Sequence, residues 1–245
     1  MPQPGVRLNS KIPRKTPTDI PTIITLDGPA GSGKSAVAHL LAQKLGFAHL
    51  DTGAMYRAVA LDAMEQGITD NPAAIAQRAA KISLDFDWSV QPAHILLNAR
   101  DVAQAIRTPE VTRLTHIAAD NPAVRAKLVE SQRKIAQSVG SLVTEGRDQG
   151  TVVFPDAAYK FYLDADVHQR ALRRVKDLAQ KGITIDLAKM IRELEQRDGR
   201  DRTRSTGPLA IPDGAVIVDT THLSLAEVVE ELASRINIKP KSVAL

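Results

Sequence analysis

The sequence predicts an α/β fold built around a mostly parallel β-sheet, and two observations support this prediction. Short apolar runs typical of buried strands recur along the chain, at residues 22–26, 141–146, 158–165 and 215–219. Three of these runs lead into helical patterns, at residues 36–46, 166–181 and 224–236. Strands that alternate with helices form parallel sheets, because each helix carries the chain back to the start of the next strand.

Composition narrows the class of protein. The chain has 245 residues, which is enough for one large domain with a well-buried core. It contains no cysteine, so disulfides, thiolate metal sites and cysteine nucleophiles are excluded. The sequence has neither an apolar stretch of the roughly 20 residues that a membrane span requires nor a secretory signal pattern. We therefore expect a soluble, cytoplasmic protein.

The positive charge is concentrated at the two ends of the chain. The formal net charge is +4 and the pI is about 9.4. Residues 1–20 hold four basic side chains and one acidic one, and two lysines lie within 237–245, so the part between is near neutral. Nucleic acid binding is not expected, since proteins that bind the phosphate backbone concentrate charge on a folded face. Four prolines without an apolar period predict a disordered basic tail over 1–20, followed by a domain over 21–236 and a C-terminal tail.

The first strand is followed by a glycine-rich loop, GPAGSGKS, and then by the first helix. Gly28, Gly33, Lys34 and Ser35 satisfy the pattern G-x-x-x-x-G-K-[ST], which is specific when it joins a strand to a helix. Glycines let successive backbone N–H groups point at a polyphosphate beside the helix N-terminus. We expect Lys34 to reach the β- and γ-phosphates of a nucleotide and the Ser35 hydroxyl to face Mg²⁺, with waters completing the metal's shell.

A change of pattern indicates an inserted subdomain. Between about residues 53 and 138, several helical stretches replace the regular alternation and include two short strand candidates, at 82–88 and 94–98. Near the start of this region, Asp51 and Thr52 are expected to cap a helix.

Two arginines of this region are candidates for a second anion site. Arg57 lies inside the helix that Asp51 and Thr52 cap, and Arg107 follows a short helical turn before Thr-Pro. Taken alone, either arginine could equally be a solvated surface charge.

The strand at 141–146 ends in Glu145-Gly146-Arg147-Asp148, at the edge of the sheet where ligands of open α/β folds bind. Arg147 could clamp a phosphate, and Asp148 could accept hydrogen bonds from a base or a sugar. Glu145 suits either a carboxylate behind a magnesium site or a structural salt bridge.

Arginines are also concentrated in two later helical segments. Arg170, Arg173 and Arg174 share one helix face, and Arg197, Asp201 and Arg204 share another. Alternating charges usually form a solvated, salt-bridged face. Beside a phosphate-binding loop they favour instead a mobile lid, over about 176–206, that supplies positive charge and excludes water.

Five segments occur in an informative order along the chain: GPAGSGKS, LDTGAMYRA, EGRDQGTVVFPDA, RDGRDRTRSTGPL and VDTTHLSLAEVV. Together they resemble the bacterial cytidylate kinases, over about residues 22 to 236. The resemblance implies a P-loop NTPase three-layer fold with a core, a monophosphate-binding insert and an arginine-rich lid. It also implies a monomer that transfers the γ-phosphate of ATP to CMP or dCMP in the presence of Mg²⁺.

The resemblance further assigns the site residues. ATP would be held by Gly28, Pro29, Ala30, Gly31, Ser32, Gly33, Lys34, Ser35 and Ala36. The monophosphate would be surrounded by Thr52, Tyr56, Arg57, Asn98, Arg107, Arg147 and Asp148, with Arg197, Asp201 and Arg204 closing on it from the lid. In this scheme Arg57 and Arg107 bind the phosphate, and Arg147 and Asp148 contact the base and the sugar. The catalytic residues would be Lys34, Arg197 and Arg204.

One departure from the family pattern concerns the segment NARDV. The family commonly has a glycine and an acid before the aspartate, where this chain has Ala99 and Arg100. The change could alter a turn of the insert or the preference among pyrimidines. No general base is assigned, because the phosphate of the acceptor is already ionised near neutral pH, and the six histidines are interpreted as structural or surface residues.

Three alternatives remain open at the level of sequence. A P-loop kinase could act on another small acceptor, such as UMP or shikimate. A regulator could bind nucleotide without productive phosphoryl transfer and signal through its insert or its basic tail. The high pI alone would suggest a nucleic-acid-binding module.

Overall fold

The computed structural model describes residues 21–180 and 182–237. The tails expected over residues 1–20 and 237–245 therefore lie outside the described residues, apart from Asn237. No helix in these two described ranges is long and apolar enough to cross a membrane.

The core is a five-stranded parallel sheet in the order β2-β6-β1-β7-β8, which confirms the predicted fold class. Its strands are β1 (Ile23–Asp27), β2 (Ala48–Asp51), β6 (Leu142–Glu145), β7 (Tyr159–Asp164) and β8 (Val216–Asp219). In the register of the sheet, Glu145 of β6 lies between Leu26 of β1 and Asp51 of β2. The carboxyl ends of these three strands therefore lie level at one edge. β2 was not predicted as a strand, because its sequence, AHLD, contains no apolar run. In the structure only one of its four residues is buried.

One face of the sheet is covered by α1 (Lys34–Leu45) and α8 (Leu225–Ser234). The core on this side packs Leu41 of α1 and Val228 of α8 against strand residues such as Ile24 and Val143. Leu142, the neighbour of Val143, belongs instead to the core on the opposite face, because successive side chains of a strand alternate between faces.

The inserted region contains most of the remaining helices. Its elements are α2 (Thr52–Glu65), α3 (Pro72–Lys81), β3 (Leu84–Asp87), β4 (His94–Leu97), β5 (Arg100–Asp101), a 3₁₀ helix η1 (Ala105–Arg107), α4 (Pro109–Ala119) and α5 (Pro122–Val139). The three strands form a small antiparallel sheet, so both strand candidates of the insert are confirmed. The insert is not a separate core, because Met55 of α2 and Leu128 of α5 pack in the same cluster as Leu142 of β6.

Local chemistry explains where three helices of the insert begin. α3, α4 and α5 each start with proline directly after an Asn or Thr whose side chain accepts a backbone N–H bond. Proline suits the first helical position because its missing N–H would have no partner there, and Asn or Thr supplies the cap. The start of each of these helices is therefore determined by its own local sequence.

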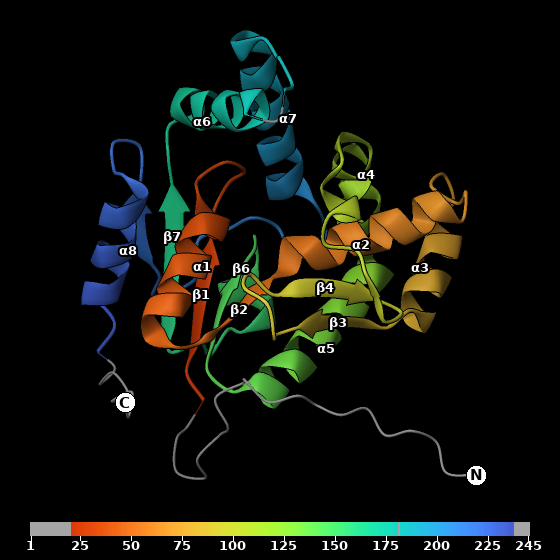
Figure 1. Cartoon of the computed structure of the whole chain (residues 1–245), viewed down its shortest axis with the longest axis horizontal. Coiled ribbons are helices and arrows are strands. Elements are labelled where there is room, and N and C mark those ends of the chain that lie inside the picture. Colours follow the sequence, from red (N-terminus) through yellow and green to blue (C-terminus); the bar gives the residue numbers. More distant parts are fainter. Residues whose placement is uncertain (1–20, 181, 238–245) are drawn as a thin grey trace.

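The last two helices before β8 stand beyond the carboxyl ends of the strands (Figure 1). They are α6 (Val167–Ala179) and α7 (Leu187–Thr203). The predicted lid region corresponds to α7 and the segment that leads into it. A small apolar cluster of Ala171, Met190 and Leu194 packs the two helices against Ala30 of the glycine-rich loop.

A π-helix, η2 (Gln149–Val153), follows β6 and was not predicted. The backbone N–H groups of Gln149 and Gly150 donate to the two carboxylate oxygens of Asp27, at 2.8 and 2.7 Å. Asp27 is the last residue of β1 and is fully buried. It therefore ties the segment after β6 to the strand that leads into the glycine-rich loop.

Candidate active site

A cavity of about 790 Å³ lies where the glycine-rich loop, the insert and α7 meet. Its volume is within the range of small-molecule sites, roughly 300–1,000 Å³. Among the described residues, nine cationic side chains line it: Lys34, Arg57, Arg107, Arg125, Arg147, Arg173, Arg174, Arg197 and Arg204. Five carboxylates also line it: Asp51, Glu145, Asp148, Asp177 and Asp201. The excess of positive charge favours a polyanionic ligand.

The glycine-rich loop forms one wall of the cavity, from Ala30 to Ala36. Gly28 has φ +144°, and a Cβ atom there would lie 2.1 Å from the carbonyl oxygen of Leu163 in β7. Only glycine allows the loop to cross β7 so closely. Gly28 and Pro29 shape the base of the loop and are not part of the cavity lining.

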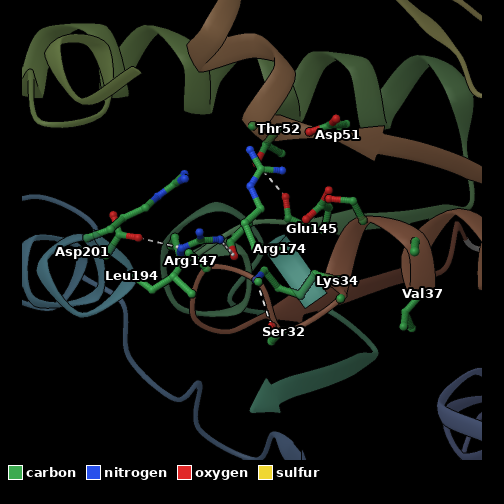
Figure 2. A pocket seen from close by; sticks show the side chains of 18 of the residues that line it. Ser32, Lys34, Val37, Asp51, Thr52, Glu145, Arg147, Arg174, Leu194 and Asp201 are labelled. Atoms are coloured by element: carbon green, nitrogen blue, oxygen red, sulfur yellow. Dashed lines mark hydrogen bonds and ion pairs between the residues drawn. The ribbon is translucent and has the colours of Figure 1, made fainter. Parts of the chain in front are cut away.

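Lys34 is the first residue of α1, and its side chain folds back over the loop. Its ammonium donates to the carbonyl of Pro29 at 2.6 Å. It also donates to the Ser32 hydroxyl at 3.1 Å (Figure 2). The side chain is buried, and burial lowers the pKa of Lys34 well below its ordinary value, as does the nearby Arg147 cation. An anionic ligand would reverse this effect, because it would stabilise the charged ammonium.

Two side chains next to Lys34 have oxygen atoms that could bind a magnesium ion. Ser35 lines the cavity at the start of α1, and Glu145 ends β6 beside it. Oε1 of Glu145 is buried without a hydrogen-bond partner, and burial, with Asp51 close by, raises the pKa of this carboxyl group. Hydroxyl and carboxylate oxygens are the ligands that Mg²⁺ prefers. The Ser35 hydroxyl and the Glu145 carboxylate therefore fit the magnesium ion that the sequence predicts.

The turn after β6 links the core to α7. The Nε–H of Arg147 donates to Oδ2 of Asp201 at 2.8 Å (Figure 2). Directly after α7, the guanidinium of Arg204 lies 3.4 Å from the other carboxylate oxygen of Asp201. Arg197 also lines the cavity, and its burial, together with the Arg147 cation, lowers its pKa to about 10. The structure thus brings together the three residues that the sequence singles out, Arg197 and Asp201 of α7 and Arg204 directly after it.

Arg125 of α5 is a site residue that sequence reasoning missed. Its guanidinium is fully buried, pairs with the carboxylate of Asp148 and lies 5.3 Å from the centre of the Tyr56 ring. Asp148 is therefore not a free acceptor but half of a buried ion pair. Nothing in the local pattern of α5 distinguishes Arg125 from a surface charge, because the pairing depends on a residue 23 positions away.

The insert contributes residues from α2 and η1. The carboxylate of Asp51 caps α2 by accepting from the N–H of Ala54 at 2.9 Å, as predicted. The Thr52 hydroxyl donates to the carbonyl of Glu145 at 2.7 Å, which fixes the start of α2 against β6. Arg107 ends η1 and is half exposed, 3.5 Å from Asp51. Arg57 lines the cavity one turn into α2.

Asn98 is the one predicted monophosphate contact that does not line the cavity. It lies on the exposed turn between β4 and β5, where its side chain accepts from the N–H of Ser83 at 2.9 Å. Asn98 and Ala99 have φ values of +50° and +64°. The residue is therefore a turn former in this arrangement. Arg100 lies beyond the turn and pairs with Glu65 at 2.6 Å.

The three arginines that share a face of α6 have different environments. Arg170 is buried and pairs with Asp198 of α7 at 2.6 Å. Arg173 lines the cavity and donates to the backbone carbonyls of Thr220 and Thr221. Arg174 also lines the cavity (Figure 2). Helical spacing grouped these residues on one face, but it could not show that Arg170 is buried in an ion pair with α7.

Comparison with known proteins agrees with this geometry. The family model described as cytidylate kinase matches residues 24–238. A cytidylate kinase of Caldanaerobacter subterraneus subsp. tengcongensis is 41% identical over 218 residues, which cover 89% of this chain and 96% of that protein. A cytidylate kinase of Pelotomaculum thermopropionicum is 43% identical over 217 residues, which cover 87% and 95%. The chain therefore belongs to the cytidylate kinase family.

Proposed function

We propose how the residues of this cavity carry out the reaction of the family, the phosphorylation of CMP or dCMP by ATP. The observation that carries the proposal is that one cavity joins a phosphate-binding loop to a second group of arginines, which come from the insert and from α7. Two anions can lie face to face in such a cavity, one on the loop and one on the arginines. This is the arrangement that phosphoryl transfer between two nucleotides requires.

ATP is proposed to bind along the glycine-rich loop. The backbone N–H groups from Gly31 to Ala36 surround its phosphates at the N-terminus of α1, and Lys34 moves from Pro29 and Ser32 to the β- and γ-phosphates. Ser35, with Glu145 behind it, would hold Mg²⁺. When bound, the ion supplies positive charge to the phosphate oxygens.

The monophosphate is proposed to bind on the insert side. Arg57 and Arg107 reach the phosphate of CMP, since both line the cavity and Arg107 is half exposed. The buried Arg125–Asp148 pair and the Tyr56 ring form the deep end of this side. Such a pair offers fixed N–H donors and carboxylate oxygens, which suits the polar edge of a pyrimidine.

The transfer step needs alignment and charge compensation more than proton transfer. The phosphate of CMP is ionised near neutral pH, so one of its oxygens can attack the γ-phosphorus of ATP directly. The bond from the γ-phosphorus to the β–γ bridging oxygen then breaks, and ADP leaves. Lys34, Arg197 and Arg204 would stabilise the negative charge on the oxygens of the migrating group. Closure of α7 over the cavity would exclude water and so suppress hydrolysis of ATP.

An ADP-formation assay tests this proposal directly. With ATP and Mg²⁺ present, CMP, dCMP, UMP, AMP and shikimate are compared as acceptors, with a reaction that lacks any acceptor as the control. Faster ADP formation with CMP and dCMP than with the others is the expected result. ADP formation without an acceptor would indicate an ATPase, and binding of nucleotide without any turnover would favour the regulator.

We also propose that the enzyme acts as a cytoplasmic monomer. The absence of cysteine from the sequence fits a reducing compartment, and the monomer is what the family resemblance implies. Size-exclusion chromatography with light scattering tests the oligomeric state. A mass near twice the 26.5 kDa of the chain would contradict the monomer.

A further inference from the structure

A buried ion pair lies between the glycine-rich loop and α7, outside the cavity lining. Asp198 of α7 and Arg170 of α6 are 2% and 5% exposed, and their side chains meet at 2.6 Å. Taking two charges out of water is unfavourable unless further hydrogen bonds satisfy both groups. The partners of these two side chains therefore indicate what the pair holds in place.

Both side chains bind the backbone of Ala30, at the apex of the loop. The N–H of Ala30 donates to Oδ1 of Asp198 at 3.1 Å, and Nη1 of Arg170 donates to the carbonyl of Ala30 at 2.8 Å. Nε of Arg170 also donates to the carbonyl of Ala165, just after β7, at 2.9 Å. One peptide segment of the loop is thus held by a carboxylate from α7 and a guanidinium from α6.

Packing reinforces these polar contacts. The Ala30 side chain belongs to the small apolar cluster formed with Ala171, Met190 and Leu194 of α6 and α7. Gly31 lies so close to α6 that a Cβ atom there would be 3.2 Å from Cβ of Arg170. The apex of the loop is therefore held against both helices by polar and apolar contacts together.

We infer that Asp198 and Arg170 are positioning residues that fix α7 to the apex of the phosphate-binding loop and thereby set the position of Arg197. Arg197 is the neighbour of Asp198 along the helix, and Asp201, one turn further on, binds Arg147. Neither Asp198 nor Arg170 lines the cavity, so both act through other groups. The inference rests on the proposed function, because it concerns where the charge reaches the migrating phosphoryl group.

The first test replaces Asp198 with alanine, and Glu195→Ala on an exposed position of the same helix is the matched control. In Asp198→Ala we expect kcat with CMP to fall at least about tenfold, because small displacements of charge-stabilising groups are costly to phosphoryl transfer. The KM for CMP should change by less than about threefold, since Arg57 and Arg107 are untouched. The ratio of ATP hydrolysis without CMP to CMP phosphorylation should rise, because a displaced α7 excludes water poorly. Glu195→Ala should match the wild type in all three.

A second variant separates positioning from stability. Asp198→Ala leaves Arg170 buried without its carboxylate, which could lower the melting temperature by itself. The double variant Arg170→Met/Asp198→Ala removes both charges, so it should regain most of the melting temperature. We expect its kcat to stay low and its hydrolysis ratio to stay high.

Recovery of the wild-type kcat and ratio in the double variant would show that the pair is only structural and would overturn the inference. Unchanged kinetics in a folded Asp198→Ala protein would overturn it equally. Absence of CMP-dependent ADP formation in the wild type would instead refute the proposed function, and the inference with it.

Discussion

The cavity has an assembled side and an open side, which hold their arginines in different ways. On the assembled side, formed by α5, the turn after β6 and α7, Arg125 and Arg147 are fixed by the carboxylates of Asp148 and Asp201. On the open side, formed by η1, Arg107 is 51% exposed and lies 3.5 Å from its nearest carboxylate, Asp51. The first side is assembled before any ligand binds, and the second is held only loosely.

This difference separates stability from recognition. A buried pair contributes to both the fold and the site, because removal of one partner leaves an unpaired charge in the interior. An exposed arginine contributes little to the fold, since surface ion pairs typically give about 0–1 kcal/mol. Substitution of one partner of a buried pair on the assembled side should therefore lower stability and activity together, and substitution of Arg107 on the open side should affect ligand binding alone.

Lys34→Ala should produce the largest effect on activity. Lys34 supplies charge to the transferred phosphoryl group in the proposed mechanism, and loss of one such preorganised donor lowers kcat by roughly 10²–10³-fold. The melting temperature should not fall, because the substitution removes a buried cation that burial disfavours. Steady-state kinetics and thermal unfolding check both points, with Lys44→Ala on the exposed face of α1 as the control. Undiminished kcat would remove Lys34 from the catalytic set.

Asp148→Asn tests the assembled side. The change leaves the guanidinium of Arg125 without a full countercharge at a site where both groups are almost completely buried. We expect a loss of about 3 kcal/mol in the free energy of unfolding. For a domain of this size the melting temperature should fall by roughly 6–12 °C. Circular dichroism melting measures the shift, and Asp156→Asn at an exposed position should leave it unchanged. A stable Asp148→Asn protein would mean that the two sides do not differ.

Arg107→Ala tests the open side. We expect the KM for CMP to rise about tenfold, equivalent to about 1.4 kcal/mol, while kcat and the KM for ATP change little. The melting temperature should stay within about 1 °C, since the side chain is half exposed. Arg113→Ala, an exposed arginine on α4, is the matched control. An effect confined to the KM for ATP would show that Arg107 contacts ATP and not CMP.

A pH-dependent prediction concerns Asp27, whose carboxylate binds the segment that follows β6. Burial raises the pKa of Asp27 to about 6, above its ordinary value of 3.8, although two backbone N–H groups oppose this shift. Ionisation therefore costs more in the folded protein than in the unfolded one. The resulting loss of stability is present above about pH 6 and is relieved as the pH falls through 6 toward 3.8. Between pH 7 and pH 5 the wild type should gain roughly 1 kcal/mol relative to Asp27→Asn. Urea unfolding of both proteins at the two pH values measures this difference, which should be absent if Asp27 has an ordinary pKa.

The comparison of the two sides also explains which site residues the sequence could predict. Lys34 and Ser35 follow from a local motif, because the loop, the strand and the helix are contiguous in the chain. The cap of α2 by Asp51 is likewise a local event. The pairing of Arg125 with Asp148 joins residues from different elements, so neither local spacing nor periodicity could reveal it.

The same limit applies to charges that share a helix face. Spacing grouped Arg170 with Arg173 and Arg174, but the burial of Arg170 depends on how α7 packs against α6. Asn98 shows a different limit. The family pattern assigns it to the monophosphate, but in this structure its side chain binds the N–H of Ser83 and lies outside the cavity lining. The parallel sheet was predictable from alternating strands and helices, whereas the π-helix η2 depends on its bonds to the distant Asp27.

The smallest expected effect comes from the turn that departs from the family pattern. Ala99 has φ +64°, a left-handed conformation that costs a residue with a Cβ atom about 1–2 kcal/mol but is open to glycine. Two consecutive residues with positive φ fit the hairpin turn in which Asn-Gly is preferred. Because glycine also gains entropy in the unfolded chain, Ala99→Gly should raise the free energy of unfolding by no more than about 1 kcal/mol. Ala126→Gly, at an exposed position inside α5, should have the opposite sign, with a loss of about 0.5–1 kcal/mol. Since Ala99 and Arg100 lie outside the cavity lining, the ratio of CMP to UMP phosphorylation should be the same in Ala99→Gly and the wild type. A changed ratio would show that this turn reaches the substrate and that the open side closes further than the loosely held Arg107 suggests.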